Sequence, residues 1–280
     1  MSSIASSNGS KVYSYKVLRP LLTLLSQCYC EAHPAVEYLL ADNHYESEPT
    51  SVVKSTSILP AIASCLDLGT APITYATPNV LELSHLYQAA RSEPNDLMSH
   101  STWWSSIDSF SLATAYRMDL EQLSKRMVCD KDSSKGTLAF LLDQGIAQMA
   151  VNLLPFFQHL IIKCGERGVL VAMHIAKPSA WSHERSNILG RYIVAQASSG
   201  SVVLQHFPAH LVHDIINVTG AGDSFVGALL AIITQDPGTF ADHHLLAKAI
   251  AASQQAAKLT LQSHLAVSPT ISYHSIMKND

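Results

Sequence analysis

The chain has 280 residues, of which 48% are hydrophobic and 14% are charged, and its formal net charge is −4. A chain of this size can bury a substantial core, as one large domain or as two small ones. The weak negative charge excludes the broad basic surface on which nucleic-acid binding depends, so we expect no nucleic-acid partner.

The cysteines and the apolar stretches bear on where the protein is found. The five cysteines form an odd set without the spacing of a disulfide framework, which indicates a reducing compartment. The first residues, MSSIASSNGS, lack the charged and apolar regions of a secretory signal. The uncharged stretch 146–162 is interrupted by Pro155 and by polar residues, which argues against a membrane span. We therefore expect a cytoplasmic protein without membrane contact.

The N-terminal part of the chain is the hardest to assign. Residues 1–10 read as a tail, and residues 11–45 have helical spacing interrupted by Pro20 and Pro34, which predicts two short helices. A fourth metal ligand is not evident beside Cys28, Cys30 and His33, so buried or surface residues are the better interpretation of these three.

From about residue 46 onwards, predicted helices and strands alternate. Residues 57–68 predict a helix and residues 72–76 a short strand. Residues 77–91 predict a second helix, with Thr77 as its N-cap and Pro78 at its first helical position.

The second half of the chain continues this alternation. Residues 92–135 are polar and irregular around STWWSS, where the two tryptophans are taken as packing or loop anchors. The further expected elements are, in order, helices at about 112–127 and within 137–157, a strand–turn–strand at 159–174, an extended segment at 201–209, the end of a strand at 215–218, and helices at 221–233 and 245–261. Alternating strands and helices predict a layered α/β fold with a mostly parallel central sheet.

The segment INVTGAGDSFVGALLA, residues 216–231, places two glycines and an aspartate directly before an apolar helix. The first backbone N–H groups of a helix have no partner within it, and the helix dipole favours negative charge at that end. Glycines at Gly220 and Gly222 let a ligand approach these amides closely, so the arrangement suits a phosphate.

Two familiar phosphate-binding motifs do not fit this segment. A P-loop needs a lysine after its last glycine, and none follows Gly222; a dinucleotide fingerprint needs glycine where Phe225 stands. A structural alternative stays open at this point: a tightly packed helix start with Asp223 as a first-turn carboxylate, worth about 0.3–1 kcal/mol.

NVTGAGDSF resembles the C-terminal signature D-T-x-G-A-G-D-x-F of the PfkB (ribokinase-like) family of carbohydrate and nucleoside kinases. Asn217 and Val218 depart from the usual Asp and Thr. The resemblance implies a three-layer α/β/α fold and ATP-dependent phosphoryl transfer to an alcohol. It further implies that Asp223 is the base that takes the hydroxyl proton, and that the amides of Gly220, Ala221 and Gly222 form an anion hole; phosphoryl transfer mainly needs such positioning and electrostatic stabilisation.

Two further segments resemble the same family. TPNVLEL is similar to its T-P-N-x-x-E segment, which implies that Asn79 and Glu82 organise Mg²⁺ and phosphate. IIKCGERGVLV resembles its strand–turn–strand, with Lys163 in place of the usual Thr. The candidates for nucleotide binding implied by the resemblance are Lys163, Gly165, Gly168, Thr219 and Ser253, the last in the helix at 245–261 near which the adenine is expected.

The resemblance extends over about residues 46–275 and is closest to fungal pseudouridine kinases, which would make the substrate a C-nucleoside. We accordingly expect residues 1–45 as a separate N-terminal segment and 46–280 as the kinase C-terminal domain. The Gly-Gly substrate motif and the β-sheet lid of the family are not found before Glu46. Two hypotheses follow: an active kinase that uses ATP, Mg²⁺ and in some members a monovalent cation, or a non-catalytic remnant that binds nucleotide or a partner. Oligomeric state, including a homodimer, stays open.

Overall fold

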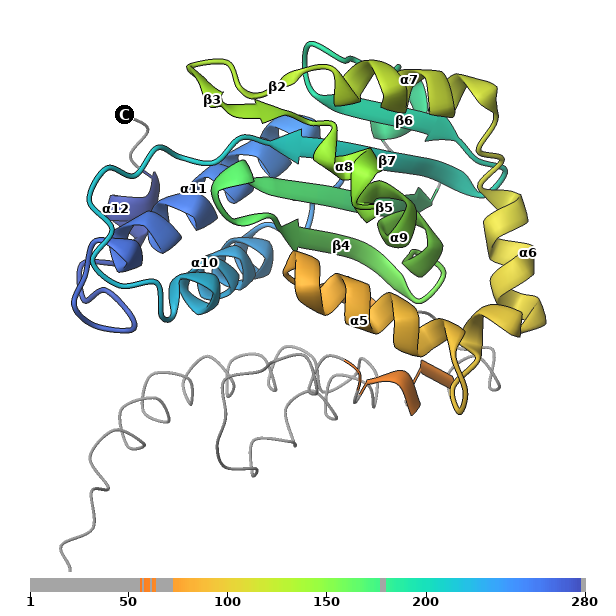
Figure 1. The fold of residues 1–280 in the computed structure, drawn as a ribbon, viewed down its shortest axis with the longest axis horizontal. Coiled ribbons are helices and arrows are strands. Elements are labelled where there is room, and N and C mark those ends of the chain that lie inside the picture. Colours follow the sequence, from red (N-terminus) through yellow and green to blue (C-terminus); the bar gives the residue numbers. More distant parts are fainter. Residues whose placement is uncertain (1–55, 57, 61, 64–72, 177–179, 278–280) are drawn as a thin grey trace, which may run out of the picture. The chain divides into compact units, whose positions relative to one another are not determined.

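The computed structural model describes residues 56, 58–60, 62–63, 73–176 and 180–277, which Figure 1 shows in colour. The chain divides into two compact units, Met1–Thr50 and Ser51–Asp280, and the described residues belong to the second. The helices expected within 11–45 and the group Cys28, Cys30 and His33 lie outside the described residues, as does most of the helix expected at 57–68.

The central feature of the second unit is a five-stranded sheet in the order β1-β4-β5-β7-β6. Its strands are β1 (Ile73–Ala76), β4 (Phe157–Lys163), β5 (Val169–Ala176), β7 (Gly200–Phe207) and β6 (Tyr192–Gln196). β1 and β4 pair in parallel, and the other three neighbouring pairs are antiparallel. The strands expected at 72–76, 159–174 and 201–209 are confirmed, whereas β6 was not predicted.

The expectation of a mostly parallel sheet is wrong for the described strands. β4 ends at Lys163 and β5 begins at Val169, while β6 ends at Gln196 and β7 begins at Gly200. Such short connections form hairpins, because a parallel pair needs a crossover of about a dozen residues or more. β1 and β4 are separated by several helices, which gives them the room that a parallel pairing needs.

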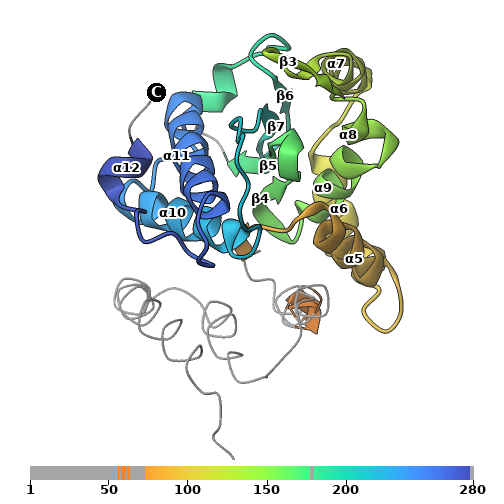
Figure 2. The same cartoon turned by 60° about the vertical axis from the view of Figure 1, so that its left-hand side comes forward.

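Helices cover both faces of this sheet, so the predicted layered α/β class is confirmed (Figure 2). Leu160 and Ile162 of β4 pack with α5 (Val80–Arg91), α8 (Phe140–Asp143) and α9 (Ile146–Leu153) in one core cluster. Ile161 packs on the other face with α10 (Ala221–Gln235) and α11 (His243–Leu261). Successive residues of a strand point to opposite faces, so one apolar strand serves both cores.

The segment around STWWSS is helical, contrary to the expectation of an irregular stretch. It forms α6 (Ser101–Ser109), whose N-cap His100 accepts a hydrogen bond from the backbone N–H of Thr102. Trp103 is buried and donates its indole N–H to the carbonyl oxygen of Asn152, whereas Trp104 is exposed. One tryptophan therefore packs as predicted, and α7 (Thr114–Ser124) follows within the helix expected at 112–127.

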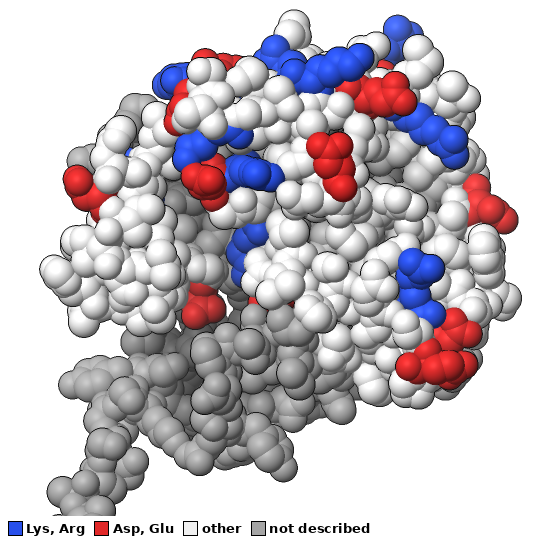
Figure 3. Space-filling model, viewed as in Figure 1, with Lys and Arg blue, Asp and Glu red and all other residues white. Residues whose placement is uncertain are grey.

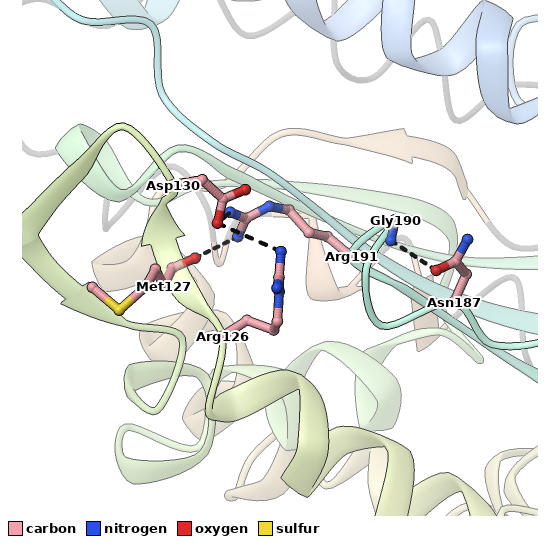
Figure 4. Close-up of polar contacts among 6 residues, drawn as sticks. All are labelled: Arg126, Met127, Asp130, Asn187, Gly190 and Arg191. Atoms are coloured by element: carbon pink, nitrogen blue, oxygen red, sulfur yellow. Dashed lines mark hydrogen bonds and ion pairs between the residues drawn. The ribbon is translucent and has the colours of Figure 1, made fainter.

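A two-stranded hairpin, β2 (Met127–Cys129) and β3 (Asp132–Thr137), lies outside the main sheet. Arg191, next to β6, joins the hairpin to the sheet: its guanidinium donates to the carbonyl oxygen of Met127 and pairs with the carboxylate of Asp130 at 2.9 Å. Figure 4 shows Arg126 and Arg191 both directed at Asp130. Arg191 is buried, so this polar contact lies within the packed structure.

Residues 215–218 do not end a strand, which corrects the expectation of a strand-to-helix junction before Gly220. The backbone N–H groups of Ile216 and Asn217 both donate to the carbonyl oxygen of Leu261 at the end of α11. Ile215, Ile216 and Val218 are exposed. These apolar residues belong to a loop that is hydrogen-bonded to the C-terminal end of α11, and α10 therefore follows a loop.

The remaining elements of the described residues are short. They are the 3₁₀ turns Leu97–Ser99, Gly165–Arg167 and Ala180–His183, and α12 (Tyr273–Met277). Among the helices of the described residues, none has the length and apolar character needed to cross a bilayer.

Candidate functional site

The carboxyl ends of β1 and β4 lie at the same edge of the sheet, because these two strands are parallel. The backbone pairing continues past β1: the N–H of Lys163 donates to the carbonyl oxygen of Pro78 at 2.9 Å, and Asn79 forms an isolated parallel bridge with Lys163. In open α/β sheets, ligands bind in the crevice outside these strand ends. The edge therefore brings the TPN segment and the end of β4 together.

Asn79 and Glu82 form a capping box at the start of α5. The Oδ1 atom of Asn79 accepts from the N–H of Glu82 at 2.9 Å, and Oε2 of Glu82 accepts from the N–H of Asn79 at 2.8 Å. Asn79 is thus the N-cap, and the prediction of Thr77 at that position is wrong, because the extended backbone continues through the bridge at Asn79 before the helix begins. The box fixes both predicted metal-organising side chains at the sheet edge.

The glycine corner is the loop and first turn of α10, from Gly220 to Asp223. Gly220 has φ +79°, and a Cβ atom there would collide with the carbonyl oxygen of Ala266. No side chain caps the first turn of α10, so the leading N–H groups of this helix are the uncapped donors that an anion can use. Asp223 lies in this turn and is exposed.

Lys163 lies beside the glycine corner, although the two are far apart in the sequence. A Cβ atom built on Gly222 would be 3.6 Å from the Nζ atom of Lys163. Burial lowers the pKa of the half-buried Lys163 ammonium, and the nearby carboxylates of Glu82 and Asp223 oppose that shift. The C-terminal end of β4 therefore lies near the N-terminal ends of α5 and α10. Figure 3 shows a hollow on this face of the molecule, with basic and acidic groups at its border.

The turn between β4 and β5 supplies the two remaining glycines of the prediction. Gly165 has φ +61° and is exposed, which leaves its backbone accessible next to Lys163. Gly168 has φ +91°, and a Cβ atom there would collide with the carbonyl oxygen of Phe207. Gly168 therefore keeps β5 close to the end of β7, while Gly165 presents backbone to solvent.

Thr219 and Ser253, the other two predicted nucleotide-binding residues, lie in different surroundings. Thr219 is exposed next to the glycine corner, and its N–H donates to Oδ1 of Asn217 at 2.9 Å. Ser253 is fully buried in α11, and its hydroxyl donates to the carbonyl oxygen of Ala249 at 2.7 Å. The structure brings Thr219 together with the glycine corner and does not bring Ser253 to it.

Sequence reasoning missed the residues that support the corner from the other side. Ser224 and Thr260 have their hydroxyl oxygens 2.7 Å apart in a buried contact between α10 and α11. Thr260 Oγ1 also accepts from the N–H of Ser268 at 3.2 Å, in the same loop as Ala266. The polar residue after Asp223, in an otherwise apolar helix, was the only sequence signal for this contact.

Comparison with known proteins bears on this site. A model of the pfkB family of carbohydrate kinases matches residues 143–272, which include Lys163, the β4–β5 turn and the glycine corner. Asn79 and Glu82 lie outside the matched residues.

The pseudouridine-metabolizing bifunctional protein of Schizosaccharomyces pombe is 27% identical to this chain over 225 residues. The alignment covers 80% of this chain and 26% of that protein, so the chain spans about a quarter of the length of this curated relative.

Among solved structures, a putative sugar kinase from Clostridium perfringens aligns with 82% of this chain and 44% of its own, at 14% identity and a TM-score of 0.38. Aminoimidazole riboside kinase from Salmonella enterica aligns with 74% of this chain and 40% of its own, at 19% identity and a TM-score of 0.31. These scores are too low to support an argument about this chain.

Proposed function

We propose that this chain catalyses, or contributes the catalytic corner for, ATP-dependent phosphorylation of a sugar or nucleoside hydroxyl. The observation that carries the proposal is the glycine corner: uncapped amides at the start of α10, with the exposed Asp223 in the same turn and Lys163 alongside. The pfkB match over residues 143–272 supports this reaction class.

In the proposed reaction, the amides of Gly220, Ala221 and Gly222 stabilise the negative charge that develops on the transferred phosphoryl group. Such preorganised donors are worth most where charge changes during the reaction. Asp223 accepts the proton of the attacking hydroxyl, and a positioned base of this kind contributes about 10²- to 10⁴-fold in rate. We assign the exposed turn at Gly165 and the exposed Thr219, next to the glycine corner, to binding of the ATP phosphates.

Mg²⁺ is the metal that we propose for this reaction, where it would supply charge to the phosphates. The donor chemistry of Asn79 and Glu82 fits, because amide and carboxylate oxygens are ligands that Mg²⁺ accepts, usually with water and phosphate completing its shell. Within the described ranges, no group of three or more His, Cys, Asp or Glu residues forms a ready-made metal site. Asn79 and Glu82 would therefore hold the ion through water and ATP oxygens.

Pseudouridine is the substrate that we propose first. The support is the S. pombe pseudouridine-metabolizing bifunctional protein, which is 27% identical to this chain over 225 residues. Ribose and uridine are the matched comparisons, because ribose lacks the base and uridine is the N-linked isomer. A preference for pseudouridine over both would identify a C-nucleoside kinase.

The test is ADP release with each of the three alcohols, in the wild type and in Asp223→Asn. We expect turnover in the wild type and a loss of about 10²- to 10⁴-fold in Asp223→Asn. Asp108→Asn is the matched control, because Asp108 is an exposed carboxylate on α6. Equal activity in wild type and Asp223→Asn would overturn the mechanism, and ATP binding without turnover in either would favour the non-catalytic alternative.

A further inference from the structure

Lys163 is the one basic side chain that the described contacts place at the glycine corner. It is the last residue of β4, and its backbone is fixed by the hydrogen bond from its N–H to the carbonyl oxygen of Pro78. Its Nζ atom reaches the first turn of α10, 3.6 Å from where a Cβ atom of Gly222 would stand. The ammonium thus lies at the amides to which the proposed function assigns the phosphoryl group.

Two carboxylates face this ammonium, Glu82 from α5 and Asp223 from α10. The neighbouring Cys164 contributes no charge, because burial raises the pKa of its thiol to about 12. The ammonium of Lys163 therefore interacts electrostatically with two negative groups in a partly buried place, where charge interactions are stronger than in water.

We propose that Lys163 is a catalytic residue whose ammonium binds the γ-phosphoryl group of ATP during transfer. This inference rests on the proposed function and assigns a role to a side chain that differs from the usual Thr. A lysine placed in this way acts as a point charge on phosphate.

The proposed step balances without a further reactant. The bond between the γ-phosphorus and the oxygen that bridges it to the β-phosphorus breaks, and its electron pair stays on ADP. The substrate hydroxyl oxygen forms the new bond to the γ-phosphorus, and its proton goes to Asp223. Lys163 keeps its own proton throughout and contributes charge only.

Two substitutions separate charge from shape. Lys163→Met removes the ammonium and keeps an unbranched side chain, whereas Lys163→Arg keeps the positive charge. We expect Lys163→Met to lower kcat by about 10- to 100-fold, the range for a hydrogen bond to a charged group, and Lys163→Arg to retain part of the rate. Lys248→Met is the matched control, because Lys248 is an exposed lysine on α11. Thermal unfolding of each variant shows whether the fold is intact.

Measurements of nucleotide affinity distinguish an error in the role of Lys163 from an error in the proposed function. Affinity for MgATP and for adenosine is measured in the wild type and in Lys163→Met; we expect a selective loss of MgATP affinity of about 10-fold or more. If the wild type has no turnover but this selective loss appears, the proposed function fails and the phosphate-binding part of the assignment stands. If the wild type turns over and Lys163→Met is as active and binds MgATP as tightly, the inference fails and the proposed function stands. Parallel losses of MgATP and adenosine affinity would also overturn it.

Discussion

The hydroxyl oxygens of Ser224 and Thr260 lie 2.7 Å apart, in a buried contact that joins the first turn of α10 to the last turn of α11. Thr260 Oγ1 also accepts from the N–H of Ser268, and the same loop provides the Ala266 carbonyl that packs against Gly220. The residue after the proposed base is therefore tied to the loop that closes behind the glycine corner. The position of Asp223 depends on this contact.

Thr260→Val should destabilise the protein by about 2–3 kcal/mol, because it leaves the buried hydroxyl of Ser224 and the N–H of Ser268 without their partner. Urea unfolding measures the change in the free energy of unfolding. Thr234→Val is the control, since the Thr234 hydroxyl is exposed and donates only to the Leu230 carbonyl of its own helix. Equal losses in the two variants would contradict the supporting role of Thr260.

Gly220→Ala should destabilise the protein by about 2 kcal/mol or more, because a side chain at φ +79° is strained and its Cβ would meet the backbone of Ala266. Gly227 offers the control in the same helix: a Cβ there would meet nothing within 4 Å. Gly227→Ala should be stabilising by about 0.5–1 kcal/mol. Thermal unfolding of both variants gives the comparison, and a neutral Gly220→Ala would refute the close approach at the corner.

The sequence predicted those parts of the site that are local. Gly220 and Asp223 are three positions apart in one motif, as are Asn79 and Glu82, so spacing alone placed each pair on a helix start. The approach of Lys163 to Gly222 depends on how β4 and α10 pack, and no local pattern records it. The same holds for the bridge between Asn79 and Lys163, which moved the N-cap of α5 away from Thr77.

The fold was predictable where a pattern had one meaning. The apolar runs at 159–174 and 201–209 gave their strands because they are buried on both faces. The apolar residues at 215–218 wrongly suggested a strand. Their backbone is hydrogen-bonded to Leu261, and their apolar side chains are exposed. α6 was missed because its polar sequence is helical only through its cap and the anchor at Trp103.

Stability should fall with acid between about pH 6.5 and pH 4, through two buried histidines. Burial lowers the pKa of His159 and of His206 to about 4 in the fold, from an ordinary value of 6.5. The unfolded chain therefore binds more protons in this window. The contribution of the two histidines to the free energy of unfolding is at its maximum above about pH 6.5 and decreases as the pH falls towards 4. Each histidine contributes on the order of 3 kcal/mol.

The measurement is urea unfolding at several pH values in the wild type, His159→Phe and His206→Leu. Each substitution costs stability at neutral pH, because His159 is hydrogen-bonded to the carbonyl oxygen of Thr74 and His206 to that of Arg167. Each should nevertheless flatten the pH dependence. His213→Gln, at an exposed histidine, should leave the slope unchanged. A pH dependence that persists in a variant carrying both His159→Phe and His206→Leu would assign the acid sensitivity to other groups.

Arg191 should be far more important to stability than the ion pair between Lys135 and Glu166, although both hold neighbouring segments together. The Arg191 side chain is only 6% exposed, and it links the carbonyl oxygen of Met127 with the carboxylate of Asp130 (Figure 4). Arg191→Met leaves both groups without this partner at the base of the hairpin. We expect a loss of about 2–4 kcal/mol in the free energy of unfolding.

The matched comparison is Lys135→Met, since Glu166 is 72% exposed and water replaces the lost partner. Exposed pairs contribute about 0–1 kcal/mol and weaken with salt. Unfolding at low and high salt should therefore show a small, salt-sensitive change for Lys135→Met and a large, salt-insensitive one for Arg191→Met. Because Arg191, the residue before β6, is bonded to the base of the hairpin, hydrogen exchange in 127–137 should rise selectively in that variant. Unchanged exchange there would mean that the hairpin is held by its other contacts.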